Sequence, residues 1–305
     1  MQIGLLGLGK MGANMARRMA RAGVSVLAWN RSVDVATTLA QTEPNVTACA
    51  DMVSMVARMA SPRVLWLMLP AGAATETAMH QLADLLSPGD IVVNGANAFY
   101  KDSQRHELEM EARGLRFMDA GVSGGVWGLA NGYALMVGGK ADTVAVVTPF
   151  IKILAPGPET GWLHCGPAGS GHFVKMVHNG IEYGMMQALG EGLSLLKGKT
   201  EFEIDLAALS EMWRHGSVVR SWLLDLTAEF LQNDQALDTV APYVPDSGEG
   251  RWTVLESVEQ GTPAPVMTLA LMMRFASQGK NDYADKLLSM MRKGFGGHGV
   301  AKEGV

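Results

Sequence analysis

The 305-residue sequence contains only two cysteines, Cys49 and Cys165, which cannot form a network of disulfides. It lacks an uninterrupted apolar stretch of the roughly 20 residues that a membrane-spanning helix needs. Its formal net charge of −5 offers no broad basic surface for nucleic acid. It also begins without a charged and then apolar leader. We therefore expect a cytoplasmic protein that binds neither membranes nor nucleic acid.

What the sequence does contain is apolar side chains, at 48% of residues against 18% charged, which is typical of a well-packed globular protein. The length exceeds the usual size of a single hydrophobic core and so predicts two domains. The 21 methionines show no pattern of metal ligands, and Met commonly fills irregular gaps between helices. We expect no bound metal.

The first residues combine a strand, a tight turn and a helix. Gln2–Leu6 is an apolar run, and a helical pattern covers 13–22. Glycines in the turn between them allow the backbone to approach a pyrophosphate at the helix N-terminus. Because a second strand, Ser25–Trp29, follows at the expected distance, we predict a bound dinucleotide. The residues expected to contact it are Gly7, Leu8, Gly9, Lys10, Met11, Gly12, Asn30, Arg31, Ser32, Leu69, Pro70 and Asn97.

The end of the second strand bears on the choice of cofactor. An acidic residue there would bind the ribose 2′-hydroxyl of NAD and repel a 2′-phosphate. This chain instead has Asn30, Arg31 and Ser32. Arg31 can pair with a phosphate, and its neighbours can donate hydrogen bonds, so the sequence favours NADP over NAD. The alternative, an ordinary exposed cation at Arg31, stays open.

Further apolar runs alternate with helical patterns at Val64–Leu69, Ile91–Asn94 and Leu115–Asp119. This alternation predicts a doubly wound parallel sheet of the Rossmann type. A linker rich in Gly and Pro follows at Pro156–Pro167. We expect an α/β fold with a dinucleotide-binding domain at 1–166 and an all-α substrate-binding and dimerisation domain at 167–305.

Long helical patterns fill the second half of the chain. The predicted helices cover 169–196, 206–215, 218–232, 253–260, a segment from the Pro263 and Pro265 region to Ser277, and 283–292.

Two loops after predicted strands carry polar groups. Asn97 could orient the nicotinamide amide or a substrate hydroxyl, or it could simply form a turn. The segment from Gly121 to Gly128 combines the Ser123 hydroxyl with the N–H groups of Gly124 and Gly125, an arrangement that suits a carboxylate close to the main chain. A flexible loop without function is the alternative.

The most informative segment places five polar side chains on one side of a helix: Lys175, His178, Asn179, Glu182 and Tyr183. At about 100° per residue all five fall within about 80° of Lys175, and Glu182 lies about 10 Å further along the axis. A base and an acid held so could take a proton from one substituent of a substrate and deliver one to another. A solvated helix surface is the alternative.

The C-terminal segment carries Arg292 and His298 on either side of a glycine-rich bend. Because such a tail is too short to fold alone, we expect the two side chains to bind an anion together with another part of the protein, such as a neighbouring subunit. A solvated C-terminus is the alternative.

Taken together, the motifs resemble those of the decarboxylating 6-phosphogluconate dehydrogenases, in the short form of that family within the β-hydroxyacid dehydrogenase superfamily. The resemblance covers nearly the whole chain. The motifs that carry it, in the family's order, are Gly7-Leu-Gly9-Lys-Met-Gly12, Ser123-Gly-Gly-Val-Trp-Gly-Leu129, Gly171 to Tyr183, Asp246 to Thr253 and Arg292 to His298.

The resemblance implies oxidation of 6-phospho-D-gluconate to ribulose 5-phosphate and carbon dioxide. Lys175 would take the proton of the C3 hydroxyl and later polarise the C3 carbonyl, and Glu182 would protonate C1. His178 and Asn179 would complete the catalytic set. The residues implied to bind substrate are Asn97, Ser123, Gly124, Gly125, Lys175, His178, Asn179, Glu182, Tyr183, Arg274, Arg292 and His298.

The resemblance also implies a homodimer or a dimer of dimers, in which the C-terminal tail completes the neighbour's site. The sequence departs from the family where Asn94-Gly-Ala96-Asn97-Ala98 replaces Asp-Gly-Gly-Asn-Ser, and where Ser247 and Glu249 replace Lys and Thr. Two alternative functions follow: a non-decarboxylating 3-hydroxyacid dehydrogenase acting on a related sugar acid, and a catalytically silent NADP-binding sensor.

Overall fold

The structure, a computed structural model, describes residues 1–301; nothing is assigned to the side chain of Phe295. The chain forms two compact units, Met1–Val177 and His178–Val305, each of which is described by itself. The first unit holds an eight-stranded sheet in the order β3-β2-β1-β4-β5-β6-β7-β8. The strands are β1 (Gln2–Leu6), β2 (Ser25–Trp29), β3 (Val46–Ala48), β4 (Val64–Leu67), β5 (Ile91–Asn94), β6 (Arg116–Ser123), β7 (Ala134–Gly139) and β8 (Trp162–Gly166).

The first six strands are parallel, and β7 pairs antiparallel with β6 and parallel with β8. The predicted α/β class is confirmed, with this antiparallel step as an addition. At β1 the chain order reverses, because β2 lies on one side of it and β4 on the other. The crevice at the carboxyl ends of such strands is where α/β sheets bind ligands. The glycine-rich turn starts there, directly after Leu6.

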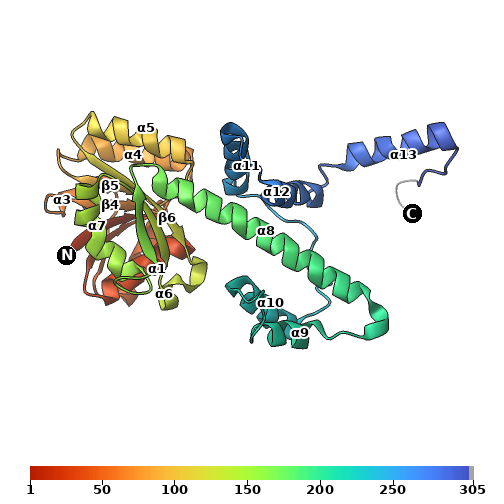
Figure 1. Cartoon of the computed structure of the whole chain (residues 1–305). Helices are drawn as coiled ribbons and strands as arrows, with labels where there is room; N and C mark the ends of the chain where they lie inside the picture. Colours follow the sequence, from red (N-terminus) through yellow and green to blue (C-terminus); the bar gives the residue numbers. More distant parts are fainter. Residues whose placement is uncertain (302–305) are drawn as a thin grey trace. The chain divides into compact units, whose positions relative to one another are not determined.

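Helices cover both faces of the sheet (Figure 1). On one face, α1 (Lys10–Arg21), α2 (Val33–Thr42) and α7 (Ala141–Leu154) pack over one buried apolar cluster. On the other, α3 (Met52–Ala57), α4 (Ala73–Leu85) and α5 (Tyr100–Glu111) pack over a second. Because both faces are buried, the central strands read as continuous apolar runs. Two short helices, η1 (Gly125–Trp127) and α6 (Gly128–Asn131), follow β6.

The structure differs from the predicted strands in several places. β6 does not end at Asp119 but continues through Gly121 to Ser123, because this part pairs with β7. The predicted linker 156–167 contains β8, an edge strand of intermediate exposure without a clear apolar run. β4 ends at Leu67 rather than Leu69. β3 and β7 were not predicted at all.

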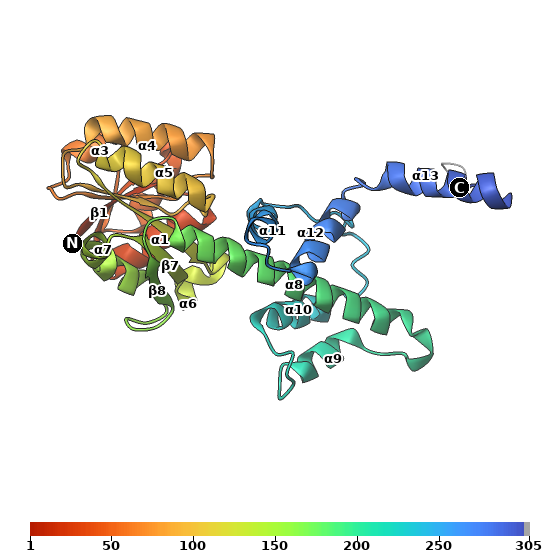
Figure 2. The same ribbon diagram turned by 45° about the horizontal axis from the view of Figure 1, so that its top comes forward.

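The second unit is helical and begins within the long helix α8 (Ser170–Gly198). It also contains η2 (Thr200–Phe202), α9 (Leu206–Trp213), α10 (Trp222–Asn233), α11 (Glu249–Gln260), α12 (Pro265–Ser277) and α13 (Asp282–Gly296). Within this unit α9 packs against α10, and α11 against α12 (Figure 2). The predicted boundary at residue 166 lies just before α8 and stays a prediction.

Several helix ends differ from the prediction. α1 starts at Lys10 rather than at 13. α10 starts at Trp222 rather than at 218, because Ser221 caps it by accepting a hydrogen bond from the Leu224 N–H. α11 starts at Glu249 rather than at 253. α13 continues past Arg292 to Gly296 and ends at Gly297, whose φ of 66° suits a helix C-terminus.

Across residues 1–301, none of the helices is long and apolar enough to cross a membrane.

Candidate active site

The glycine-rich turn between β1 and α1 fits a pyrophosphate. Gly7 has a φ of 96°, and a Cβ there would lie 2.5 Å from the Met68 carbonyl oxygen. A Cβ at Gly12 would lie 2.0 Å from the Gly7 carbonyl oxygen, so α1 packs directly on the turn. Gly9 instead faces open space. Within the described residues no side chain caps α1 and no acid occupies its first turn, which leaves the N–H groups there available to an anion.

Asn30 holds this turn from the end of β2. Its Oδ1 accepts a hydrogen bond from the Leu8 N–H at 3.0 Å, and its Nδ2 donates to the Ser32 carbonyl at 3.2 Å. Arg31 and Ser32 are exposed just beyond it. As far as the structure describes, the Ser32 hydroxyl makes no capping bond to α2, and a hydroxyl proton of this kind can be donated to a phosphate oxygen.

The loop after β4 forms the other side of the turn. A Cβ at Gly7 would lie 2.9 Å from Leu69 Cδ2, so the Leu69 side chain lies against the glycine-rich turn. Pro70 is exposed, and its carbonyl accepts a hydrogen bond from Thr75 at 2.8 Å, which fixes the loop to α4. The predicted cofactor residues of the first unit therefore surround the carboxyl ends of β1, β2 and β4.

Asn97 bridges the loop after β5 to β6. Its Nδ2 donates to the Val122 carbonyl at 3.0 Å, and its Oδ1 accepts from the Val122 N–H at 2.8 Å. Its φ of 52° is the left-handed conformation that Asn tolerates. A side-chain amide has a second hydrogen and a second lone pair, so Asn97 can still bind a ligand. This contact also fixes the place of Ser123, the next residue on β6.

Ser123, Gly124 and Gly125 lie at the end of β6 and the start of η1. Gly124 and Gly125 have φ of 137° and 53°, conformations that favour glycine. A Cβ at Gly125 would meet open space, which a carboxylate near the main chain could occupy. The sequence predicted a loop here, whereas the structure has the last residue of β6, Ser123, followed by the single helical turn η1.

Lys175 lies in the second turn of α8, on the side that faces β6. The residue is 5% exposed. A Cβ at Gly121 would lie 2.4 Å from the Lys175 Cβ, so the lysine stem packs on the bare backbone of β6. Lys175 is thus a buried amine on the first part of α8, and its stem lies against β6.

His178, Asn179 and Glu182 belong to the second unit and lie on the continuation of α8. His178 Nδ1 lies 3.0 Å from Asn179 Oδ1 and 3.9 Å from Glu182 Oε2. The side chains of His178 and Glu182 are 39% and 38% exposed, so both stay open to a ligand. Their helix is continuous with the one that carries Lys175.

Tyr183 is buried at the contact of α8 with α12, where its ring packs on Ala270 and Leu271. The Arg274 guanidinium carbon lies 3.5 Å from the ring centroid, and Nη1 donates to the Pro245 carbonyl at 2.7 Å. The Tyr183 hydroxyl lies 3.1 Å from Ser247 Oγ. A ring and a guanidinium stacked in this way form a rigid pair within the second unit.

Ser247 also donates a hydrogen bond to Glu249. The Ser247 hydroxyl has one proton, which it donates to Glu249, so its oxygen accepts the proton of Tyr183. Ser247 and Glu249, the two departures from the family pattern, are thus joined to each other and to the Tyr183 hydroxyl by hydrogen bonds.

Arg292 and His298 are exposed near the end of the described chain. Arg292 lies within α13, and His298 follows the helix end at Gly297. The structure thus places Arg292 and His298 on α13 and just after it, while Tyr183 and Arg274 form a separate cluster.

The sequence analysis did not single out a buried cluster beside Lys175. Burial raises the pKa of Asp119 on β6 to about 7, and the residue accepts hydrogen bonds from the backbone of α8. Burial lowers the pKa of His172 to about 3, and its Nδ1 lies 2.7 Å from Ser103 Oγ on α5. Two features of the sequence could have indicated this cluster: Asp119 is an acid inside an apolar strand, and His172 lies one helical turn before Lys175.

Among residues 1–301, no group of three or more His, Cys, Asp and Glu side chains could hold a metal ion.

Comparisons with known proteins match both halves of the chain. The family model for the NAD binding domain of 6-phosphogluconate dehydrogenase matches residues 2–165, and that for the 6-phosphogluconate dehydrogenase C-terminal domain matches 171–299. An NAD(+)-dependent, decarboxylating 6-phosphogluconate dehydrogenase of Haloferax volcanii is 38% identical over 307 residues, which are 99% of each chain. A longer Bacillus subtilis enzyme of the same description is 31% identical over 92% of this chain and 62% of its own.

Among solved structures, 6-phosphogluconate dehydrogenase of Plasmodium falciparum superposes with a TM-score of 0.84 at 27% identity, over 100% of this chain and 67% of that one. The matches cover the glycine-rich turn, the long helix and the segment with Arg292 and His298. The chain belongs to the 6-phosphogluconate dehydrogenase family.

Proposed function

We propose that the protein oxidises and decarboxylates 6-phospho-D-gluconate, giving ribulose 5-phosphate and carbon dioxide with reduction of NADP or NAD. The observation that carries this proposal is α8: one uninterrupted helix bears the buried Lys175 and, two turns later, Glu182. Family membership along both halves of the chain supports the same reaction. A surface helix would not require a buried lysine.

The cofactor would be held by the glycine-rich turn, Asn30 to Ser32, Leu69 and Asn97. When bound, the nicotinamide accepts the hydride from C3 of the substrate. The exposed Arg31 and the hydroxyl of Ser32 favour NADP, since both can bind a 2′-phosphate. The relatives include NAD(+)-dependent enzymes, so NAD is the competing choice.

The protons would be handled by two side chains of α8. Lys175, in its neutral form, takes the proton of the C3 hydroxyl as C3 loses its hydride, so that a 3-keto acid forms. The resulting ammonium polarises the C3 carbonyl while the bond from C1 to C2 breaks. The electrons of that bond form the C2=C3 double bond of an enediol, whose C3 oxygen takes the proton back from Lys175, and the carboxylate leaves as carbon dioxide. Glu182 then gives a proton to C2, which becomes C1 of ribulose 5-phosphate, while the C3 hydroxyl returns its proton to Lys175 and becomes the ketone.

The remaining residues would orient the substrate. Ser123 and the N–H groups of Gly124 and Gly125 would hold the carboxylate, and His178, Asn179 and Asn97 would bind hydroxyl groups. Arg274 would hold the phosphate while Tyr183, bonded to Ser247, supports its guanidinium, and Arg292 and His298 would complete the phosphate site. Arg and His are suited to this because their hydrogen bonds to phosphate are charge-assisted.

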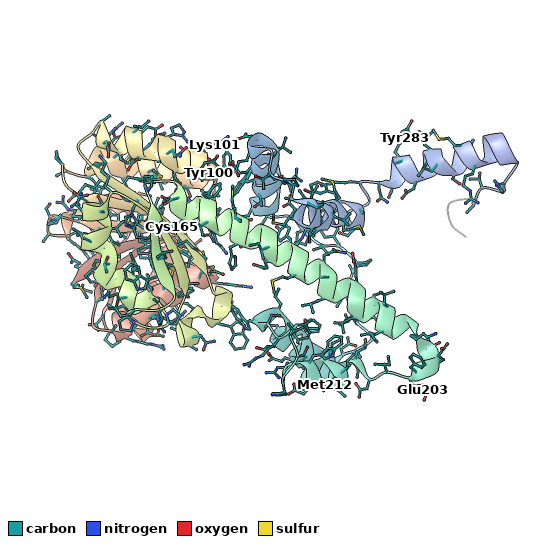
Figure 3. All side chains as sticks on the ribbon, in the orientation of Figure 1. Tyr100, Lys101, Cys165, Glu203, Met212 and Tyr283 are labelled. Atoms are coloured by element: carbon teal, nitrogen blue, oxygen red, sulfur yellow. The ribbon has the colours of Figure 1, made fainter. Side chains whose placement is uncertain are left out.

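We also propose that two copies of the chain associate, as a homodimer or a dimer of dimers, with the tail of each completing the other's site. Apolar side chains of the second unit support this. Tyr283 near the start of α13 (Figure 3) is 80% exposed, and Leu195 on α8 is 77% exposed. A cavity of about 460 Å³ between α8, α9 and α10 is lined mostly by apolar side chains. Such surfaces commonly mark protein interfaces.

A cytoplasmic location is part of the proposal and is supported by the two free thiols, Cys49 and Cys165.

The test combines two readouts from one reaction. The purified protein is given 6-phosphogluconate labelled at C1, with NADP or NAD, and both reduced nicotinamide and released labelled carbon dioxide are measured. We expect both products in equal amounts. Reduced nicotinamide without carbon dioxide would indicate the non-decarboxylating dehydrogenase, and neither product with either cofactor would indicate the NADP-binding sensor.

A further inference from the structure

The first turn of α8 is capped by a side chain that is distant in the sequence. The first N–H groups of a helix have no partner inside the helix. Here the Gly169 N–H donates to Asp119 Oδ1 and the His172 N–H donates to Asp119 Oδ2, both at 2.6 Å. Asp119 comes from β6 and is fully buried. The sheet itself therefore supplies the cap of this helix.

The backbone around the carboxylate leaves it little freedom. A Cβ at Gly138 on β7 would lie 2.6 Å from Asp119 Oδ1. A Cβ at Gly171 would lie 2.9 Å from Asp119 Oδ2 and 2.5 Å from the Met136 carbonyl oxygen. Two glycines thus allow strand and helix to close around the acid, and neither oxygen can move far without a clash.

A second buried contact holds the same turn from α5. His172 is 1% exposed, and its Nδ1 lies 2.7 Å from Ser103 Oγ. Lys175 follows His172 by three residues and so lies above it on one face of the helix. The Lys175 stem in turn packs on Gly121, two residues after Asp119 on β6. Strand β6 therefore contacts α8 at its cap and again at the lysine.

We propose that Asp119 is a positioning residue for Lys175: by holding two N–H groups of the first turn of α8, its carboxylate sets where the amine meets the substrate. The inference rests on the proposed function, in which Lys175 is the base. Asp119 touches neither substrate nor cofactor in this role. Ser103 acts in the same direction through His172. Misplacement of a catalytic group by about 1 Å can cost about 10²-fold in rate, whereas binding by other residues persists.

The test is Asp119→Asn, which keeps the volume of the side chain but puts an amide N–H group where one carboxylate oxygen accepted. Asp90→Asn is the matched control. Asp90 is also fully buried and accepts two backbone N–H bonds, from Arg63 at 2.7 Å and Ser87 at 2.9 Å, but it does not bind α8. Both variants are compared with wild type for kcat, KM for 6-phosphogluconate, NADP affinity and thermal stability.

We expect Asp119→Asn to lower kcat by about 10²-fold while KM and NADP affinity change little. The isotope effect on kcat with substrate deuterated at C3 should rise, because the chemical step becomes slower than product release. Asp90→Asn should lose stability but keep kcat. A kcat near wild type in Asp119→Asn, or equal losses of kcat in both variants, overturns the proposal.

If Asp119→Asn does not fold, Ser103→Ala tests the same positioning of Lys175. It removes the hydroxyl that holds His172, and we expect a smaller fall in kcat with the same unchanged KM and raised isotope effect. An unchanged kcat in that variant contradicts the inference. If the wild-type protein shows no turnover, both the proposed function and this inference are contradicted. If the wild-type protein and Asp119→Asn are both fully active, only the positioning role of Asp119 is contradicted.

Discussion

The two units of the chain bury their apolar side chains to very different extents. The first unit closes two apolar clusters, one on each face of its sheet. In the second unit the described cluster is small, formed by Tyr183, Ala270 and Leu271. Large apolar side chains stay exposed on α13, as at Leu288 with 59%. The comparison teaches that the first unit completes its own core, whereas the second presents surfaces suited to another copy.

A similar contrast holds for several of the polar side chains assigned to the site. In the first unit, Asn30 and Asn97 are each bonded to the backbone at two points, and Lys175 is buried. In the second unit, Glu182 is partly exposed and Arg292 is exposed. Cofactor binding should therefore survive changes in the second unit that abolish substrate turnover.

The largest expected effect is that of Lys175→Met, which removes the amine but keeps a long apolar stem. Turnover should fall by about 10³-fold, since a general base contributes on that order. NADP affinity, measured by nucleotide fluorescence, should stay near wild type. Lys140→Met, at an exposed lysine paired with Glu111, is the control and should keep full activity. Substantial turnover in Lys175→Met would remove the lysine from the mechanism.

Glu182→Gln should have the next largest effect. Steady-state release of carbon dioxide should fall by about 10²-fold, because the enediol carbon that becomes C1 of ribulose 5-phosphate loses its proton donor, whereas NADP affinity should hardly change. Glu191→Gln is a matched control on the same helix, where the carboxylate accepts a hydrogen bond from Gln187. The assignment of the acid fails if Glu182→Gln turns over like wild type.

Joint replacement of Arg292 and His298 by Ala should raise KM for 6-phosphogluconate by about 10- to 100-fold, because charge-assisted bonds to phosphate are worth about 1.5–3 kcal/mol. Lys286→Ala, also on α13, serves as the control. Cofactor affinity should not change in either variant.

Mixing this double variant with Lys175→Met sharpens the same test. If the tail completes the partner's site, a mixed dimer contains one site with both the wild-type lysine and the wild-type tail. At a substrate concentration far below the raised KM, both proteins are nearly inactive alone, and activity should then reappear on mixing them. No recovery, in a sample shown to exchange subunits, would place the tail in its own chain's site or outside any site.

Arg31→Ala should have the smallest effect of the series on turnover, because it changes only the binding of the cofactor. It should weaken NADP binding by about 1–3 kcal/mol, the value of a hydrogen bond to a charged group, with little change for NAD. Arg58→Ala, at another exposed arginine of the first unit, controls for the loss of one positive charge. Equal losses for both nucleotides would overturn the preference for NADP.

Much of the fold could be predicted because buried parallel strands have short, continuous apolar runs in their sequence. β1, β2 and β5 were predicted with their observed ends. β7 was missed although 134–137 is a short apolar run, because two glycines follow it directly, and β8 was missed because the mixed side chains of 162–166 give no such run. β7 is held by pairing with β6, and β8 by pairing with β7, which are tertiary effects.

Within the site, the polar stripe of α8 could be predicted because helical spacing alone places its members. The role of Asp119 could not, because its partners Gly169 and His172 lie 50 and 53 residues further along the chain. The bonds of Asn97 to Val122 depend likewise on how two strands meet. Local sequence indicated which residues carry reactive groups, whereas only the folded chain showed what holds those groups in place.

The unbroken course of α8 limits what evolution or engineering can do between Lys175 and Glu182. One inserted or deleted residue in that interval would turn every later side chain of the helix by about 100°. Glu182 and Tyr183, and also His178 if the change precedes it, would turn away from the amine together, although each would still be present in the sequence. Substitutions can adjust this enzyme gradually, but a change of length here would disable it in a single event.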